Sequence, residues 1–163
     1  MPAPAPLALY EAAVEPEWLD WNDHMNVAYF LLAFDRATDA LYRYLGVAED
    51  YIEGRGHSMF ALETHVVYHR ELRGGDPIRV TTQLLGFDDK RIHFIHQMYH
   101  GADGYLAAAN DWLAIHVDLA RRRAARFPPD IAARLAEIRE AHAGLPTPPA
   151  VGRAISLDSR KPA

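Results

Sequence analysis

One long apolar helix followed by four alternating segments is the feature that most restricts the fold of this chain. Apolar residues recur at helical spacing over residues 27–45, and Gly46 stands where a C-terminal cap belongs. The first two turns, VAYFLLAF, are apolar on every side. A helix of that kind is enclosed by other structure rather than laid on a surface, so we expect it at the centre of the fold.

Period-two alternation predicts a sheet around this helix. We expect strands at residues 7–14, 58–72, 78–87, 91–100 and 105–119. In the second of these, one face is expected to carry Phe60, Leu62, Val66 and Tyr68, and the other Glu63, His65 and His69. Residues 53–57, with two glycines, are expected to form a linker. Long strands with short turns after one buried helix indicate an α+β fold, an antiparallel sheet curled round that helix.

The domain organisation follows from length and from the positions of proline. At 163 residues the chain is long enough for one domain with a core and short for two. We expect a single domain over residues 1–143 that ends in a helix at 128–142, opened by Pro128 and Pro129. Residues 144–163 are proline-rich and then polar, which predicts a tail that is mobile or laid across another surface.

Composition excludes several classes of function. The formal net charge is -5, which argues against general nucleic-acid binding. The sequence contains no cysteine, which rules out disulfides, thiolate metal sites and a cysteine nucleophile. No segment predicts a signal peptide or approaches the roughly 20 apolar residues of a membrane span. We therefore expect a cytoplasmic protein.

Polar and aromatic side chains are concentrated in WLDWNDHMN, residues 18–26, directly before the helix. The order of strand, this D-x-N-x-H-M-N loop, apolar helix and four antiparallel strands resembles the hot-dog fold. More narrowly, residues 7–128 resemble acyl-CoA thioesterases of the 4-hydroxybenzoyl-CoA thioesterase type, whose motif is Asp-x-x-Gly-His-x-Asn. Asp20 falls on the catalytic carboxylate of that motif, and Asp23 stands where glycine is usual. The resemblance implies a cofactor-free enzyme that hydrolyses acyl-CoA thioesters.

The later segments GDPIRV, DDKRIHFIH and AIHVD resemble the small thioesterases associated with bacterial carnitine breakdown. This second resemblance implies betainyl-CoA as the substrate. A quaternary ammonium group suits an aromatic cage, and we predict that four residues form one: Trp18, Trp21, Tyr29 and Trp112. The alternative is that these residues pack in the core or at an interface.

Thioester hydrolysis requires an activated nucleophile, donors for the developing oxyanion and a groove for the coenzyme. Asp20 is predicted either to attack the carbonyl or to act as base for water. His24 and Asn26 are predicted to orient the carbonyl or water, beside unpaired N–H groups at the helix start. The alternative is structural: Asn22 or Asn26 caps the helix, while Asp20 and His24 lie in a solvated turn. Glu63 is the backup carboxylate.

Coenzyme A carries phosphates, which need cations near one mouth of the site. We predict contacts from Lys90 and Arg91, which open a strand. Other basic residues are further candidates: Arg70, Arg73, Arg121, Arg122, Arg123 and Arg126. The alternative for each is a solvated surface residue.

The nine histidines raise the question of a metal site. His65 and His69 would lie about 13 Å apart on a strand, too far to share a metal ion. His93 and His96 would point to opposite faces of a regular strand. The spacing therefore predicts no metal.

An uncovered sheet edge and a shallow site predict a homodimer or a tetramer of dimers. The resemblance to thioesterases implies acyl-CoA as the bound partner. Two other functions stay open. One is a non-catalytic acyl-CoA-binding module on the same fold, and the other a histidine-rich, metal-dependent enzyme on a small β-barrel. Asp20 in register with the thioesterase motif argues against the first, and the histidine spacing argues against the second.

Overall fold

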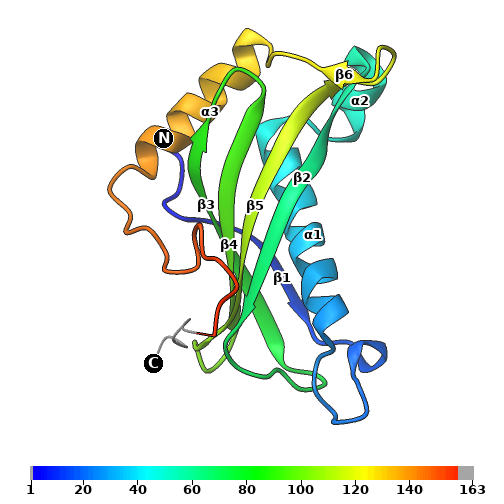
Figure 1. Ribbon diagram of the computed structural model, residues 1–163, viewed down its shortest axis with the longest axis vertical. Coiled ribbons are helices and arrows are strands. Elements are labelled where there is room, and N and C mark those ends of the chain that lie inside the picture. The colour runs from blue at the N-terminus through cyan, green and yellow to red at the C-terminus, as the bar shows by residue number, and fades with distance from the viewer. Residues whose placement is uncertain (1, 158–163) are drawn as a thin grey trace.

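The computed structural model describes residues 2–157, and this part of the chain forms one six-stranded antiparallel sheet with a long helix along its concave face (Figure 1). The strands are β1 (Leu7–Ala13), β2 (His57–Tyr68), β3 (Pro77–Phe87), β4 (Arg91–His100), β5 (Leu106–Asp118) and β6 (Arg123–Ala124). The helices are the short 3-10 turn η1 (Pro16–Trp18), α1 (Val27–Leu45), α2 (Glu49–Arg55) and α3 (Pro129–Ala141). The strand order is β1-β3-β4-β5-β2, with β6 on β5, which confirms the curled sheet and the hot-dog arrangement.

Helix α1 covers the predicted residues because both of its ends are capped. Asn26 is the N-cap, and its side-chain oxygen accepts a hydrogen bond from the backbone N–H of Ala28 at 2.9 Å. Gly46 ends the helix in the left-handed conformation, at φ 81°, which costs glycine little. Among the described helices, none is long and apolar enough to span a bilayer.

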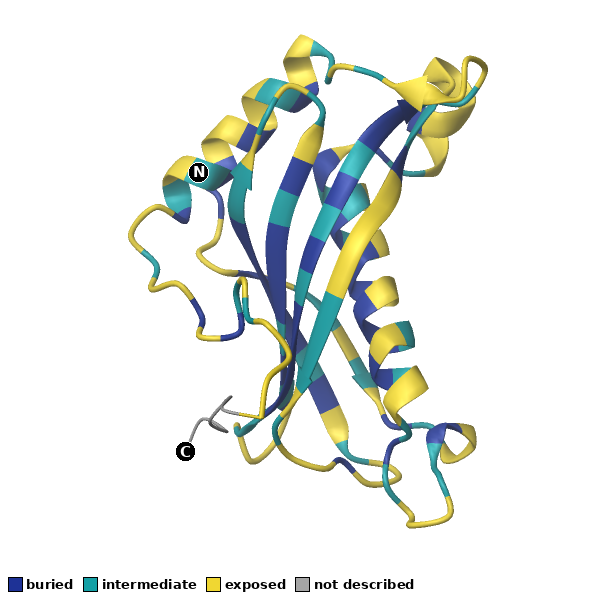
Figure 2. Cartoon of the chain, viewed as in Figure 1, coloured by how far each residue is buried: buried dark blue, intermediate teal, exposed yellow. Residues whose placement is uncertain are grey.

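The core lies between α1 and the concave face of the sheet, and Figure 2 shows that buried residues are concentrated in β3, β4 and β5. Phe34 of α1 packs on the ring of His96 in β4, and Phe94 stacks on Trp112 of β5. Helix α3 extends this core past the first residue of β1, Leu7, through its buried side chains Ile131, Leu135 and Ile138. His142 follows α3, and its Nδ1 accepts the backbone N–H of Leu84 at 2.9 Å, which satisfies a donor on the edge of β3.

Two expectations about the segment after α1 are wrong. Residues 53–57 were expected to form a linker, but residues 49–55 form helix α2. Gly56 is the residue that caps its C-terminal end, at φ 66°. In β2, Ala61 pairs with Ala114 and Glu63 with Leu113, so Leu62 is bulged out of the register. One inserted residue reverses the alternation. Phe60 and Val66 therefore lie on opposite faces, not on one.

The tail is laid across this chain's own sheet, on the convex face opposite α1 (Figure 1). Ala150 is buried there against Ile95 and Ala109. The backbone N–H of Gly152 donates to the carboxylate of Asp111 at 2.8 Å. The described part of the tail is thus held by packing, while its final residues, 158–163, lie outside the described range.

Candidate active site

The loop before α1 is a tight turn that brings Asp20 back beside the helix start. Leu19 pairs with Met25, and the N–H of Asp20 donates to the carbonyl of His24 at 2.9 Å. Asp23 adopts φ 59°, a left-handed conformation that favours glycine and that aspartate tolerates better than most residues. The loop therefore keeps its turn although Asp23 stands where the family motif has glycine.

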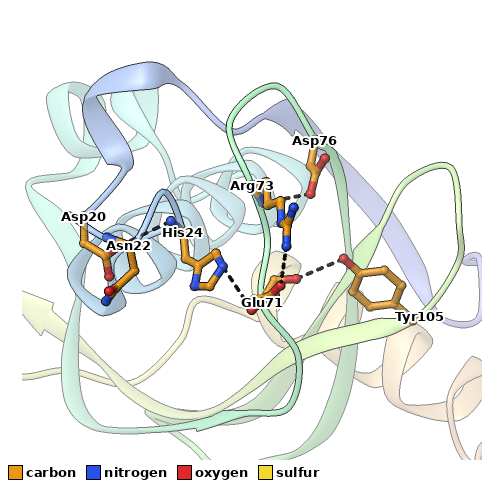
Figure 3. Close-up of polar contacts among 7 residues, drawn as sticks. All are labelled: Asp20, Asn22, His24, Glu71, Arg73, Asp76 and Tyr105. Atoms are coloured by element: carbon orange, nitrogen blue, oxygen red, sulfur yellow. Dashed lines mark hydrogen bonds and ion pairs between the residues drawn. The ribbon is translucent and has the colours of Figure 1, made fainter.

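The Asp20 carboxylate has one engaged oxygen and one free oxygen. Its Oδ1 accepts the backbone N–H of Asn22 at 2.8 Å and that of His24 at 3.3 Å (Figure 3). Its Oδ2 makes no hydrogen bond with any residue of the described chain. The residue thus serves the turn through one oxygen, as the structural alternative expects, and leaves the other available for chemistry.

His24 points away from this carboxylate toward a second loop (Figure 3). Its Nε2 lies 3.1 Å from Oε2 of Glu71, whose Oε1 accepts from Nη2 of Arg73 at 3.1 Å. The Tyr105 hydroxyl donates to the backbone carbonyl of Glu71 at 2.9 Å. Glu71 is the residue that sequence reasoning missed, because nothing in the sequence shows that the loop before β3 meets the loop before α1.

The start of α1 offers one free donor. Asn26 caps Ala28, and the carbonyl of Asn26 accepts the N–H groups of Tyr29 and Phe30 at 3.0 and 3.4 Å. Within the described chain the N–H of Val27 has no acceptor. It lies at the positive end of the helix dipole, where negative charge is stabilised. Of the unpaired backbone N–H groups expected at the start of α1, only that of Val27 is unpaired within the described chain.

The four predicted cage aromatics lie in different places within one chain. Trp18 is buried and stacks on Tyr29, with ring centroids 5.9 Å apart. Trp21 is 96% exposed at the tip of the loop. Trp112 belongs to a separate buried cluster with Phe94. A single protomer therefore does not bring these residues together as one cage.

Glu63 lies on the convex face, across the sheet from α1. It lines a cavity of about 260 Å³ together with His65, His93 and Asp111. Nε2 of His93 lies 2.7 Å from Asp111, and this hydrogen bond raises the pKa of His93 above its usual range. The backup carboxylate is thus separated from the loop of Asp20 by the sheet itself.

The basic residues predicted to bind the CoA phosphates differ in whether an acidic side chain already pairs with them. Arg91 pairs with Asp88 at 2.6 Å, and this contact is the main reason that the pKa of Asp88 falls to about 2. The Lys90 side chain, in contrast, has no partner among residues 2–157. Arg122 and Arg123 likewise make no ion pair within the described residues, and they line a cavity of about 130 Å³ beside Phe60.

His96 shows how the structure uses a histidine for packing rather than for metal. It is fully buried, and its Nε2 and Nδ1 lie 2.9 Å and 2.8 Å from the hydroxyls of Thr38 and Thr82. Because the Thr38 hydroxyl already donates to the carbonyl of Phe34, Nε2 carries the proton and donates. Burial lowers the pKa of His96 to about 3. Within residues 2–157, no three histidines or carboxylates come together as metal ligands.

Comparison with known proteins places this geometry in a family. The family model described as the thioesterase-like superfamily matches residues 14–135. The betainyl-CoA thioesterase of Pseudomonas aeruginosa is 41% identical over 93% of this chain and 95% of its own length. An L-carnitine dehydrogenase/betainyl-CoA thioesterase of Rhizobium meliloti is 36% identical over 93% of this chain, which spans 30% of that longer protein.

Solved structures agree with the sequence comparison. A hypothetical protein of Staphylococcus aureus in complex with CoA superposes with a TM-score of 0.88 at 25% identity, covering 95% of this chain and 98% of that one. A candidate thioesterase of Pseudomonas putida gives a TM-score of 0.83 at 34% identity, covering 96% and 100%. With the family model, the relatives and the fold in agreement, this chain belongs to the thioesterase-like superfamily.

Proposed function

We propose that this protein hydrolyses betainyl-CoA, a short cationic acyl-CoA thioester, to the free acid and CoA. The observation that carries the proposal is the 41% identity to a betainyl-CoA thioesterase over nearly the whole of both chains. The loop of Asp20 supports it, because the carboxylate required by the thioesterase motif has a free oxygen beside the helix start. We place the reaction in the cytoplasm and assign it no cofactor.

The proposed chemistry uses two groups of the loop. The free oxygen of Asp20 attacks the thioester carbonyl, or takes a proton from the water that does so. The carbonyl oxygen gains negative charge as the bond forms, and the unpaired N–H of Val27 is the proposed donor to it. Collapse of the intermediate then expels CoA as its thiolate. When water is the nucleophile this step gives the free acid directly. When Asp20 is the nucleophile, it leaves an acyl anhydride on Asp20, which water hydrolyses to the free acid and the regenerated carboxylate. His24 is assigned a positioning role through its contact with Glu71, which ties two loops together.

The active form is proposed to be a homodimer joined along β2. This strand is an edge of the sheet with 12 residues, and Figure 2 shows its middle part exposed. Large apolar side chains are exposed on β2, at Phe60, Leu62 and Tyr68, and on α1, at Val27 and Leu31. A long unpaired edge beside an apolar surface favours pairing with a second copy.

Symmetry determines what such a dimer brings together. A two-fold axis perpendicular to the sheet makes the two β2 strands run antiparallel. If the axis passes near the middle of the strand, Tyr68 of one copy lies beside His57 of the other. The Tyr68 hydroxyl donates to the carbonyl of Val27 at 3.2 Å, so this end of β2 adjoins the start of α1. Arg122 and Arg123 lie beside Phe60 at the opposite end, so the dimer carries them toward the other copy's Asp20 loop, where CoA phosphates need cations.

Replacing Leu62 by lysine is expected to convert the dimer to monomers. Leu62 is 52% exposed at the bulge of β2, and a charged residue there opposes pairing of two edges. The matched control is Ile155→Lys, which places the same charge on an exposed apolar residue of the tail. Light scattering at micromolar concentration measures the outcome. A wild-type protein that is a stable and active monomer at that concentration contradicts the dimer.

The proposed substrate is tested by thiol release from a panel of acyl-CoA esters. We expect betainyl-CoA to be hydrolysed with a kcat/KM at least about tenfold above acetyl-, long-chain and aryl-CoA esters, a factor worth about 1.4 kcal/mol. Turnover is expected to be unchanged by a chelator. Binding of acyl-CoA without any thiol release would favour the non-catalytic alternative, and faster turnover of long-chain or aryl esters would overturn the assignment of betainyl-CoA.

A further inference from the structure

His142 joins distant segments of the chain at one point beside the edge of β3. It directly follows α3, and it is 1% exposed. Its Nε2 lies 2.9 Å from the carbonyl oxygen of Pro4 in the N-terminal segment, and its Nδ1 lies 2.9 Å from the backbone nitrogen of Leu84 in β3. Its backbone carbonyl accepts the N–H of Leu145, near the start of the tail. One residue therefore connects the N-terminal segment, α3 and the tail to the sheet.

The contact with Leu84 fills a gap that strand pairing leaves. The pairing of β1 with β3 ends at Leu7 and Thr82, so β3 has no neighbouring strand on this side beyond that pair. The N–H of Leu84 is buried here, and a buried N–H without an acceptor costs about 1–3 kcal/mol. The imidazole of His142 thus supplies an acceptor that a longer β1 would otherwise provide.

The two contacts fix the form of the His142 ring. A carbonyl oxygen can only accept, so Nε2 carries a proton and donates it to Pro4. A backbone N–H can only donate, so Nδ1 carries a lone pair and accepts from Leu84. Both contacts therefore require the neutral imidazole. A proton on Nδ1 would face the N–H of Leu84, and neither donor can turn into an acceptor.

No acidic side chain among the described residues compensates a proton on His142. The charged group that acts on it is Arg139 of α3, and the facing parts of β3 and of the N-terminal segment present backbone groups. Burial, and then the charge of Arg139, lower the pKa of His142, and the hydrogen bond that its ring donates opposes this only in part. His100 differs: its Nδ1 also accepts a backbone N–H, but carboxylate oxygens of Asp76 and Asp103 lie 3.5 and 3.8 Å from its ring nitrogens.

We propose that His142 is a proton-operated clasp, whose protonation releases the end of α3, the N-terminal segment and the start of the tail from β3 while the central strands stay paired. Release does not require strands to separate, because α3 packs beyond the end of β1. The other side-chain hydrogen bonds that hold α3 to the described chain involve exposed residues: Arg55 with Asp130, and Arg134 with the carbonyl of Tyr44.

Amide hydrogen exchange measures this release. Because the pKa of His142 is lower in the clasped form, the open form takes up the proton first as the pH falls below its ordinary value of 6.5. The protection factor of an amide is already corrected for its intrinsic exchange rate. We expect the protection factors of Leu84 and of α3 to fall about tenfold between pH 7.5 and pH 5.5. At pH 5.5 they should lie at least about tenfold below those of β4, whose exchange requires the whole sheet to open.

The matched variant is His142→Gln. Its amide can accept from Leu84 and donate to Pro4, as the neutral imidazole does, but it does not titrate. Protection of Leu84 and α3 should therefore agree within about twofold at the two pH values. The control is His65→Gln, which removes a half-buried imidazole of β2 that makes no hydrogen bond with a described residue. It should keep the pH dependence of the wild type.

A His142→Gln protein that loses as much protection as the wild type overturns the clasp. So does a wild type in which Leu84 and α3 exchange no faster than β4. Should the variant fail to fold, the wild type alone decides. Two-bond proton–nitrogen correlation spectra at pH 7.5 are expected to show a proton on Nε2 of His142 and a lone pair on Nδ1, and the reverse form overturns the proposal. These measurements need no substrate, so their outcome is independent of the proposed thioesterase activity.

Discussion

Asp20→Asn is expected to lower kcat for the preferred acyl-CoA ester at least about 100-fold, the usual scale for loss of a positioned base. Asparagine keeps an oxygen that accepts the N–H groups of Asn22 and His24, so the turn is retained. What it loses is the free carboxylate oxygen. We therefore expect KM to change little and the free energy of unfolding to stay within about 0.5 kcal/mol of wild type.

Two companion variants separate chemistry from structure. Asp20→Ala removes the turn hydrogen bonds as well, and should cost about 1 kcal/mol of stability in addition to the lost turnover. Asp23→Asn makes the same chemical change on the neighbouring carboxylate, whose φ of 59° asparagine adopts readily, and should leave kcat unchanged. Near-normal turnover of Asp20→Asn would remove Asp20 from the mechanism and make Glu63→Gln the next variant to measure.

Acid is expected to destabilise the fold through His96, by about 2 kcal/mol between pH 7 and pH 5. Its pKa is about 3 in the folded protein and 6.5 in the unfolded chain. Because the folded pKa is the lower one, the unfolded state takes up the proton first as the pH falls. The stabilisation is complete above pH 6.5 and is lost progressively as the pH falls toward 3.

The variant that isolates this effect is His96→Gln. Its amide can donate to Thr38 and accept from Thr82, as the neutral imidazole does, but it does not titrate. Urea unfolding at pH 7, 6 and 5, at one protein concentration, should give a shallower pH dependence for the variant than for wild type. Burial also lowers the pKa of His116 and His142, so both proteins keep some slope. Equal slopes would contradict the role of His96.

Helix α1 and the strands were predictable because their signals are local. The bounds of α1 follow from a 3.6-residue repeat, the Asn26 cap and Gly46, all read within one segment. The bulge at Leu62 was not predictable, since it arises from the pairing of β2 with β5 rather than from the residues of β2. That one inserted residue puts Phe60 on the same face as Glu63 and His65, whereas the alternation in the sequence predicts that Phe60 lies on the opposite face.

The carboxylate in the loop before α1, the central helix and the family resemblance were all contained in the order of residues along the chain, because each depends on neighbours a few positions apart. Tertiary structure alone decided which distant groups meet. It set Glu71 against His24, buried His96 between two threonines, and laid the tail across the convex face of the sheet. Those pairings depend on how the sheet curls and where β2 is bulged, and no local pattern in the chain encodes either.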